Sequence, residues 1–167
     1  SGFTDLLNLG KIFDVQDRAQ KVVADQRALL AKIDAAVKGK KRPRVFLLDA
    51  VGSKGEIWTN TSSYVQALVR RAGGTLVPAP GPDRYSTSRE ALAASSFDLV
   101  LVTHYTGDVA KSVGTDRERA EKIFALAPNA PGSKARRWEA VPYPGGPNGV
   151  LITKRFAQAI HPGALQG

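Results

Sequence analysis

A long amphipathic helix that leads directly into a buried strand is the feature that most constrains this fold. From Asp14 to Lys38, apolar residues recur at helical spacing on one face, and Gln, Asp, Lys and Arg occupy the opposite face. At 1.5 Å per residue, such a helix is roughly 37 Å long, well above the ordinary mean. Asp14 suits the N-cap position, and Phe3–Phe13 is interpreted as an apolar stretch that contains a turn.

After this helix, the chain alternates apolar strands with short helices. Arg44–Asp49 and Phe97–Thr103 are continuous apolar runs, typical of strands buried on both faces of a parallel sheet. Weaker strands are expected at Thr75–Val77 and Trp138–Val141, and the last helix at Ile152–Ile160. The sequence therefore predicts an α/β fold, a three-layer α/β/α domain with a mostly parallel sheet of about four to five strands, preceded by the long helix.

Turn residues and capping motifs predict the boundaries of the remaining elements. A helix is expected to start at Asn60 or Thr61, and two more start at the capping-box spacings Thr87–Glu90 and Thr115–Glu118. The segments between these elements are expected to be loops: Ala50–Asn60, Pro78–Arg84, His104–Gly114 and Pro142–Gly149.

Composition excludes several classes of protein. The 167 residues are 43% hydrophobic, which suits one domain with a core, and they contain no apolar run of the ~18 residues that a membrane span needs. The absence of Cys excludes disulfides, thiolate metal sites and Cys nucleophiles. The net charge of +9 is compatible with nucleic acid, an anionic surface or an anionic ligand.

The densest group of cations lies at the end of the long helix, from Lys38 to Arg44. Cations are favourable at a helix C-terminus, where they are solvated, and no aromatic residues are interspersed with this group. A basic nucleic-acid-binding domain is therefore the least favoured alternative, and we predict no nucleic-acid partner.

The chain lacks the common catalytic signatures. It contains neither phosphate loop, no dinucleotide-binding Gly motif after a strand, no His-Glu-x-x-His and no Gly-x-Ser-x-Gly. The segment Gly52–Gly55 follows a strand, but a plain turn explains it better than an anion site. We therefore predict that the protein is not an enzyme and has no catalytic residue, no metal site and no intrinsic cofactor. An α/β enzyme or nucleotide-binding domain is the main alternative, and it would need a phosphate loop or an acid–base pair.

Aromatic and imidazole side chains follow the predicted strands at the edge where ligands bind in open parallel sheets. They are Trp58, Tyr85, His104, Tyr105 and Tyr143. Such rings with a few polar groups suit a bulky ligand, and Tyr and His can also ligate iron. The structural alternatives are that Trp58 covers a helix, that His104 is a surface histidine and that Tyr143 packs within its loop.

Several motifs, in this order, resemble the C-terminal lobe of class III periplasmic substrate-binding proteins, the iron-siderophore, haem and cobalamin receptors of ABC importers. The most specific are Ala72-Gly-Gly74 at a helix end and the stretch STSREALAASSFDLVLV. The helix DRAQKVVADQRALLAKIDAAV is similar to the single helix that joins the two lobes, and Trp138-Glu-Ala-Val-Pro is similar to the family's last strand.

This resemblance implies an organisation and a set of partners. Residues 1–42 would be the remnant of the N-terminal lobe with the interlobe helix, and residues 43–167 the C-terminal lobe. The five rings would face a ferric siderophore, haem or cobalamin, and Glu90 would dock on the ABC permease, although it also suits a capping box. The protein would be exported, periplasmic or lipid-anchored, and the fragment alone would bind weakly. We expect the N-terminal half of the long helix to be under-packed, or covered by self-association with a second copy.

Overall fold

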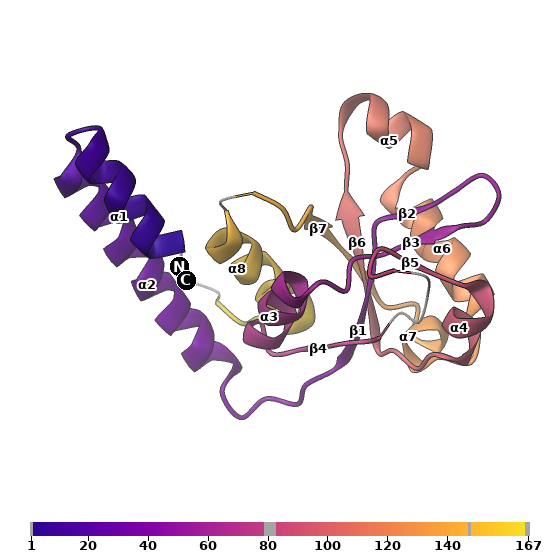
Figure 1. Ribbon diagram of the computed structural model, residues 1–167. Helices are drawn as coiled ribbons and strands as arrows, with labels where there is room; N and C mark the ends of the chain where they lie inside the picture. Colours follow the sequence, from indigo (N-terminus) through magenta and orange to yellow (C-terminus); the bar gives the residue numbers. More distant parts are fainter. Residues whose placement is uncertain (1, 79–82, 147, 166–167) are drawn as a thin grey trace.

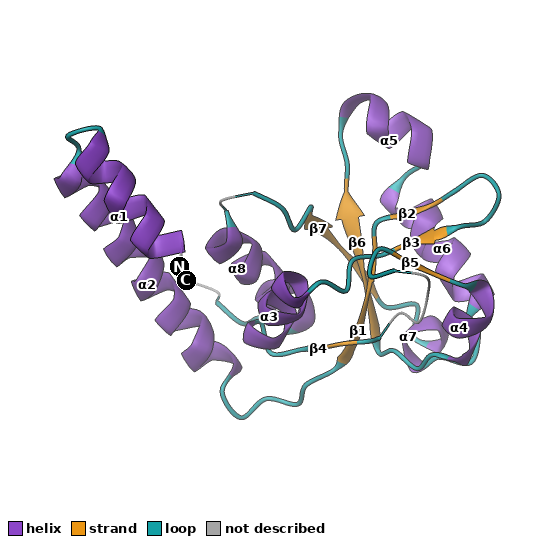
Figure 2. Cartoon of the chain, viewed as in Figure 1, coloured by secondary structure: helices purple, strands orange, loops and turns teal. Residues whose placement is uncertain are grey.

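The computed structural model describes residues 2–78, 83–146 and 148–165, and its centre is a four-stranded parallel sheet (Figures 1 and 2). The strands lie in the order β4-β1-β6-β7, so that the first strand of the chain is internal. Residues Val45 to Leu48 pair in register with Leu99 to Val102. The strand bounds are β1 (Arg44–Leu48), β4 (Thr75–Leu76), β6 (Leu99–His104) and β7 (Trp138–Pro142).

Helices cover both faces of the sheet, which confirms the predicted three-layer α/β/α fold (Figure 1). One face packs against α3 (Ser63–Arg71) and α8 (Gly149–Ile160). The other packs against α4 (Arg89–Ala94) and α6 (Asp116–Leu126), and α7 (Pro131–Lys134) contacts α6 and β6.

The pattern of β1 explains why both faces need cover. Val45 and Leu47 lie in one hydrophobic core, whereas Phe46 and Leu48 lie in the other, and all four are almost fully buried. Successive side chains of a strand point to opposite faces, so a continuous apolar run leaves neither face free for water.

The N-terminal segment is a helical hairpin, α1 (Gly2–Ile12) and α2 (Gln16–Val37). The prediction of a turn-containing stretch for Phe3–Phe13 was wrong, and the long helix starts two residues later than predicted. Asp14 is not the N-cap; it adopts a left-handed φ of 53° in the turn. Gly10 permits the close packing of the two helices, because a Cβ there would lie 2.5 Å from Cβ of Ala19.

The long helix is buried unevenly. Its C-terminal half buries Leu30, Ile33 and Val37 in the same core as α3 and α8. On its N-terminal half Ala19 and Val23 are buried, but Val22 and the N-cap residue Val15 are 37% and 45% exposed. The N-terminal half is therefore less well packed than the C-terminal half, as the sequence predicted.

Two predicted loops contain regular structure. Within Ala50–Asn60 lie β2 (Ala50–Val51) and β3 (Ile57–Trp58), which form a three-stranded antiparallel sheet with β5 (Ser86–Thr87). Within His104–Gly114 lies the helix α5 (Gly107–Val113). Part of the predicted loop Pro78–Arg84, residues 79–82, lies outside the described residues.

Helix caps agree with the sequence at one of the two predicted capping boxes. Thr115 and Glu118 form the complete box at the start of α6. At α4 the N-cap is Ser88, whose hydroxyl accepts a hydrogen bond from the Ala91 amide, because Thr87 belongs to β5. The helix α3 is capped by Ser62 and not by Asn60 or Thr61.

Candidate functional site

The carboxyl ends of β1, β6 and β7 meet at one edge of the parallel sheet, the upper edge in Figure 1. The register pairs His104 with Pro142, so Tyr105 and Tyr143 follow two adjacent strands. Their ring centroids lie 6.3 Å apart with an interplanar angle of 37°. Three of the five predicted site residues, His104, Tyr105 and Tyr143, are therefore together at this edge.

The small antiparallel sheet positions the other two rings beside the end of β1. The Asp49 amide donates to the Trp58 carbonyl at 2.9 Å, and the Thr59 amide donates to the Tyr85 carbonyl at 3.0 Å. The Thr59 hydroxyl, almost fully buried, donates to the carbonyl of Leu47 at 2.6 Å. These bonds fix the backbone of Trp58 and Tyr85 against the last residues of β1.

Four of the predicted site residues are about half exposed to solvent. The exposed fractions are 46% for Trp58, 49% for Tyr85 and 52% for Tyr143, and His104 is also exposed, whereas Tyr105 is half-buried. Apolar rings at this exposure retain contact area that a ligand can cover. Because nearly half of the Trp58 side chain is exposed, packing within the protein covers only part of its surface.

A buried arginine, Arg119 of α6, binds backbone carbonyls at the ends of β1 and β6. Its side chain is 1% exposed, and it donates to the Thr103 carbonyl at 2.8 Å, to the Asp116 carboxylate at 2.6 Å and to the Asp49 carbonyl. The guanidinium also lies 5.3 Å from the centroid of the Tyr105 ring. A planar guanidinium can satisfy several acceptors at once, which suits it to join two strands and a helix.

The carboxylate of Asp49 is the second buried polar group. It accepts a hydrogen bond from the Thr103 hydroxyl at 2.6 Å. Burial raises the pKa of Asp49 above its ordinary value, and the Thr103 hydrogen bond and the charge of Arg119 oppose that shift.

His104 is oriented by a carboxylate. Its Nδ1 lies 2.6 Å from Oδ2 of Asp116, the same carboxylate that binds Arg119 through Oδ1. An ionised carboxylate only accepts, so Nδ1 is the donor in this contact, and in the neutral tautomer that makes it Nε2 is the acceptor. Carboxylates in this position commonly orient histidines that bind metals or ligands.

Burial, then the charge of Asp49 and the neighbouring Tyr143, raises the pKa of Tyr105 to about 12. The phenol is therefore neutral at neutral pH and available as a hydrogen-bond donor. The edge thus offers ring faces, a phenol and an imidazole nitrogen, which suit binding of a bulky ligand.

Within the described parts of the chain, no group of three or more His, Asp or Glu side chains could hold a metal ion. The candidate anion turn Gly52–Gly55 is occupied by the protein itself, because the Lys54 amide donates to the Glu56 carboxylate at 3.2 Å.

Glu90 lies apart from the ring cluster, in the first turn of α4, where it is exposed. Hydrogen bonds from its own amide and from Ser88 lower the pKa of its carboxyl group. It is therefore a charged surface group at neutral pH, near the N-terminus of a short helix.

Sequence reasoning missed Asp49, Asp116 and Arg119. Arg119 stands four residues before the buried Ile123, on the inward face of α6. That spacing was the available signal, because a cation on the apolar face of a helix needs buried acceptors.

Comparisons with known proteins identify the family and the fold of this chain. A family model described as periplasmic binding protein matches residues 1–127. No curated protein sequence gives a significant match. No helix among the described residues is both long and apolar enough to span a bilayer.

Solved structures with the same fold include a periplasmic binding protein from Veillonella parvula, at 27% identity and a TM-score of 0.78 over 96% of this chain and 56% of that one. S. aureus IsdE complexed with heme gives 20% identity and a TM-score of 0.70, over 95% of this chain and 63% of that one. An ABC-type Fe3+-hydroxamate transport protein from Saccharomonospora viridis gives 22% and 0.68, over 94% and 54%. The chain thus spans little more than half the length of these proteins.

Proposed function

Because the chain belongs to the periplasmic binding protein family, we propose that it is the C-terminal part of the substrate-binding component of an ABC importer. In this proposal, residues 43–167 are the C-terminal lobe, and residues 1–42 are the end of an N-terminal lobe with the interlobe helix. The partial coverage of the similar structures supports this division.

The observation that carries the proposal is the cluster of rings at the carboxyl edge of the parallel sheet. Ligands of open α/β sheets bind at this edge. Trp58, Tyr85, His104, Tyr105 and Tyr143 provide apolar faces with a few polar groups, as sites for large planar or chelated ligands do. The ligand class is a ferric siderophore, haem or a cobalamin-type molecule, in line with the heme and Fe3+-hydroxamate named for two similar structures.

Iron arrives in this proposal as part of the cargo and not as a resident cofactor. His104 is the strongest candidate ligand, because Asp116 holds Nδ1 and leaves Nε2 free. Tyr105 contributes a neutral phenol that can donate a hydrogen bond or pack against the ligand.

Delivery of the cargo requires a permease, and Glu90 is the proposed docking residue on this lobe. Its exposure and its lowered pKa keep a negative charge on the surface, where an arginine of the permease can pair with it. The role is non-catalytic, and the protein is expected to be exported and held in the periplasm or by a lipid anchor.

The hairpin α1–α2 supports the existence of a partner for this lobe. Leu9, Ile12, Phe13, Val15 and Val22 are between 37% and 73% exposed. Exposed apolar side chains grouped on one surface mark an interface. In the longer protein the N-terminal lobe covers these side chains. The isolated 167-residue chain is expected to self-associate, and analytical ultracentrifugation of this chain and of its Phe13→Ser variant measures the association.

Titration of the longer protein, with both lobes, against ferric siderophores, haem and cobalamin tests the proposed function. We expect saturable binding to one class, and much weaker binding to the 167-residue chain, which supplies half of a cleft. Absence of binding to all three classes would contradict the proposal, and a DNA shift at low salt would favour the nucleic-acid alternative.

A further inference from the structure

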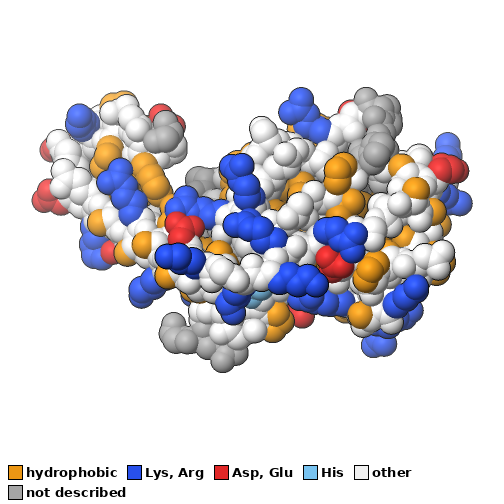
Figure 3. Space-filling model, turned by 90° about the horizontal axis from the view of Figure 1, so that it is seen from below, with side chains coloured by type: hydrophobic (Ala, Val, Ile, Leu, Met, Phe, Trp, Pro, Cys, Tyr) orange, Lys and Arg blue, Asp and Glu red, His pale blue; other side chains and the backbone are white. Residues whose placement is uncertain are grey.

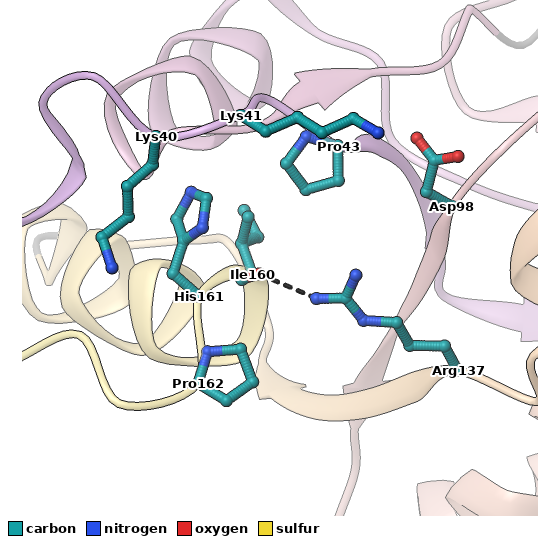
Figure 4. Close-up of a pocket in the computed structure, with 8 residues that line it drawn as sticks. All are labelled: Lys40, Lys41, Pro43, Asp98, Arg137, Ile160, His161 and Pro162. Carbon is teal, nitrogen blue, oxygen red and sulfur yellow. Dashed lines mark hydrogen bonds between the residues drawn. The ribbon is translucent and has the colours of Figure 1, made fainter.

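The edge of the sheet opposite the ring cluster carries a hollow of about 390 Å³ (Figure 4). It lies where β1, β6 and β7 begin, and it is lined by Lys40, Lys41, Asp98, Arg137, His161 and Pro162, among others. This volume lies at the lower end of the range for small-molecule sites. The hollow plays no part in the proposed cargo site.

Cations reach this hollow from segments far apart in the sequence. Lys40 and Lys41 belong to the link between α2 and β1, Arg137 directly precedes β7, and His161 ends α8. Figure 4 shows these side chains around one opening, and Figure 3 shows Lys and Arg side chains gathered on the face seen from this side. Folding, and not sequence proximity alone, brings this positive charge together.

The carboxylate of Asp98 offsets only part of the positive charge around the hollow. It pairs with Arg44, which reaches it with Nε at 3.2 Å and with a terminal nitrogen at 2.9 Å, and the charge of Lys41 also helps to lower the pKa of Asp98. Within the described residues, Lys40, Lys41 and Arg137 form no ion pair. Arg137 uses one N–H to bind the Ile160 carbonyl at 2.8 Å, which leaves further donors.

The ionisation of His161 agrees with a positive field in the hollow. Burial lowers the pKa of its imidazole, and the charges of Lys40, Arg137 and Arg42 lower it further, against a hydrogen bond with the Gly73 carbonyl.

A purely structural explanation accounts for only part of this arrangement. Cations at helix C-termini are favourable, and Arg137 does donate to the last carbonyl of α8, that of Ile160. Lys40 and Lys41 are exposed and make no such contact, although both lie at the opening of a concave surface. Among the described lining residues, three cations, Lys40, Lys41 and Arg137, surround the hollow together with one carboxylate, that of Asp98, which also pairs with Arg44. This excess of positive charge matches the chemistry of an oxyanion site.

We propose that this hollow binds a phosphate group. Lys40 and Lys41 supply point charges, and the free N–H groups of Arg137 supply directed donors. The space exceeds that of a bare phosphate ion, so a phosphate ester fits as well. The two sources of this chemistry are free phosphate compounds and the head group of an anionic phospholipid.

The first experiment follows the two histidine rings by NMR while inorganic phosphate replaces chloride at constant ionic strength, near pH 6.5. Bound phosphate stabilises the imidazolium, so the His161 ring signals should move towards the protonated position. The His104 signals, at the opposite edge, should not move. The second arm measures co-sedimentation with phosphatidylglycerol vesicles and with phosphatidylcholine vesicles.

Paired variants separate a site from general electrostatics. Lys40→Gln/Lys41→Gln should weaken phosphate or vesicle binding about tenfold, because two charges near the anion are lost. Lys11→Gln/Lys32→Gln removes the same charge from exposed positions on α1 and α2, and it should change binding less than about twofold. Circular dichroism confirms that both pairs remain folded.

Each outcome decides the proposal. A His161 response to phosphate that depends on Lys40 and Lys41 supports the site with free phosphate as a source, and lysine-dependent binding to phosphatidylglycerol alone supports the head group as the source. The proposal is overturned if neither probe binds, if both variant pairs lose binding equally, or if only DNA binds.

Discussion

Replacement of Arg119 by Met tests whether the buried polar network holds the candidate site together. The change keeps a long side chain but removes the donors to the Thr103 and Asp49 carbonyls and to the Asp116 carboxylate. An unsatisfied buried acceptor costs about 1–3 kcal/mol, and breaking a buried ion pair costs about 3–5 kcal/mol. Because Asp116 keeps some access to water, we expect a loss of about 3–4 kcal/mol in the free energy of unfolding.

Urea unfolding measures this loss directly. For a slope of about 2 kcal/mol per molar urea, the midpoint should fall by about 1.5–2 M with an unchanged slope. Arg117→Met, on the exposed face of the same helix, is the matched control and should change stability by less than about 0.5 kcal/mol. A loss below about 1 kcal/mol for Arg119→Met, or equal losses for the two variants, would show that the buried network of Arg119 does not stabilise the strand ends.

Three further predictions address the hairpin, the pH response and the permease contact. Gly10→Val should lower the free energy of unfolding by about 1–3 kcal/mol, since the Cβ of the new valine would collide with Ala19. Gly2→Ala, where a Cβ meets no other atom, should leave stability unchanged. Thermal unfolding of the two variants measures the difference. The pKa of His161 is lowered in the folded state, so the unfolded chain takes up a proton at a higher pH than the folded chain does. The free energy of unfolding should therefore fall as the pH drops below about 6.5. His161→Gln should make the free energy of unfolding, measured with urea, depend less on pH in this range. Glu90→Lys in the longer protein should abolish uptake of the cargo while its affinity stays unchanged, and normal uptake would exclude Glu90 as the docking residue.

The main elements of the sheet could be predicted from sequence because burial on both faces leaves a strong signal. Val45 to Leu48 and Leu99 to Val102 are uninterrupted apolar runs. Few structures other than a strand buried on both faces require such short, continuous apolar runs. The strands β2, β3 and β5 have two residues each and depend on hydrogen bonds between distant segments, such as that from Thr59 to Tyr85. Strands that short have no periodicity to detect.

Two helices, α1 and α5, were not predicted from the sequence, for different reasons. In α1, Asn8 and Gly10 suggested a turn, but packing against α2 overrides their low helix propensity. The helix α5 has only seven residues and none of them is buried, so it lacks the long apolar stripe that predicts a helix packed on a core.

The candidate site also has a part that could be predicted from the sequence and a part that could not. Its exposed rings could be predicted, because strand ends are visible in the sequence and aromatic residues are few. Its supporting network could not, because Asp49, Asp116 and Arg119 look like ordinary surface charges until the fold brings β1, β6 and α6 together.

The most direct test of the central claim is the affinity of the longer protein for its cargo when a ring at the carboxyl edge is removed. Tyr143→Ala, measured by calorimetry with the ligand that binds, should weaken affinity at least about fivefold, because a stacked ring contributes about 1–3 kcal/mol. Tyr64→Ala is the control, since Tyr64 is similarly exposed at 43% but lies on α3, in a hollow beside α1. The account predicts a loss for Tyr143→Ala alone, and unchanged affinity, or an equal loss for both variants, would contradict it.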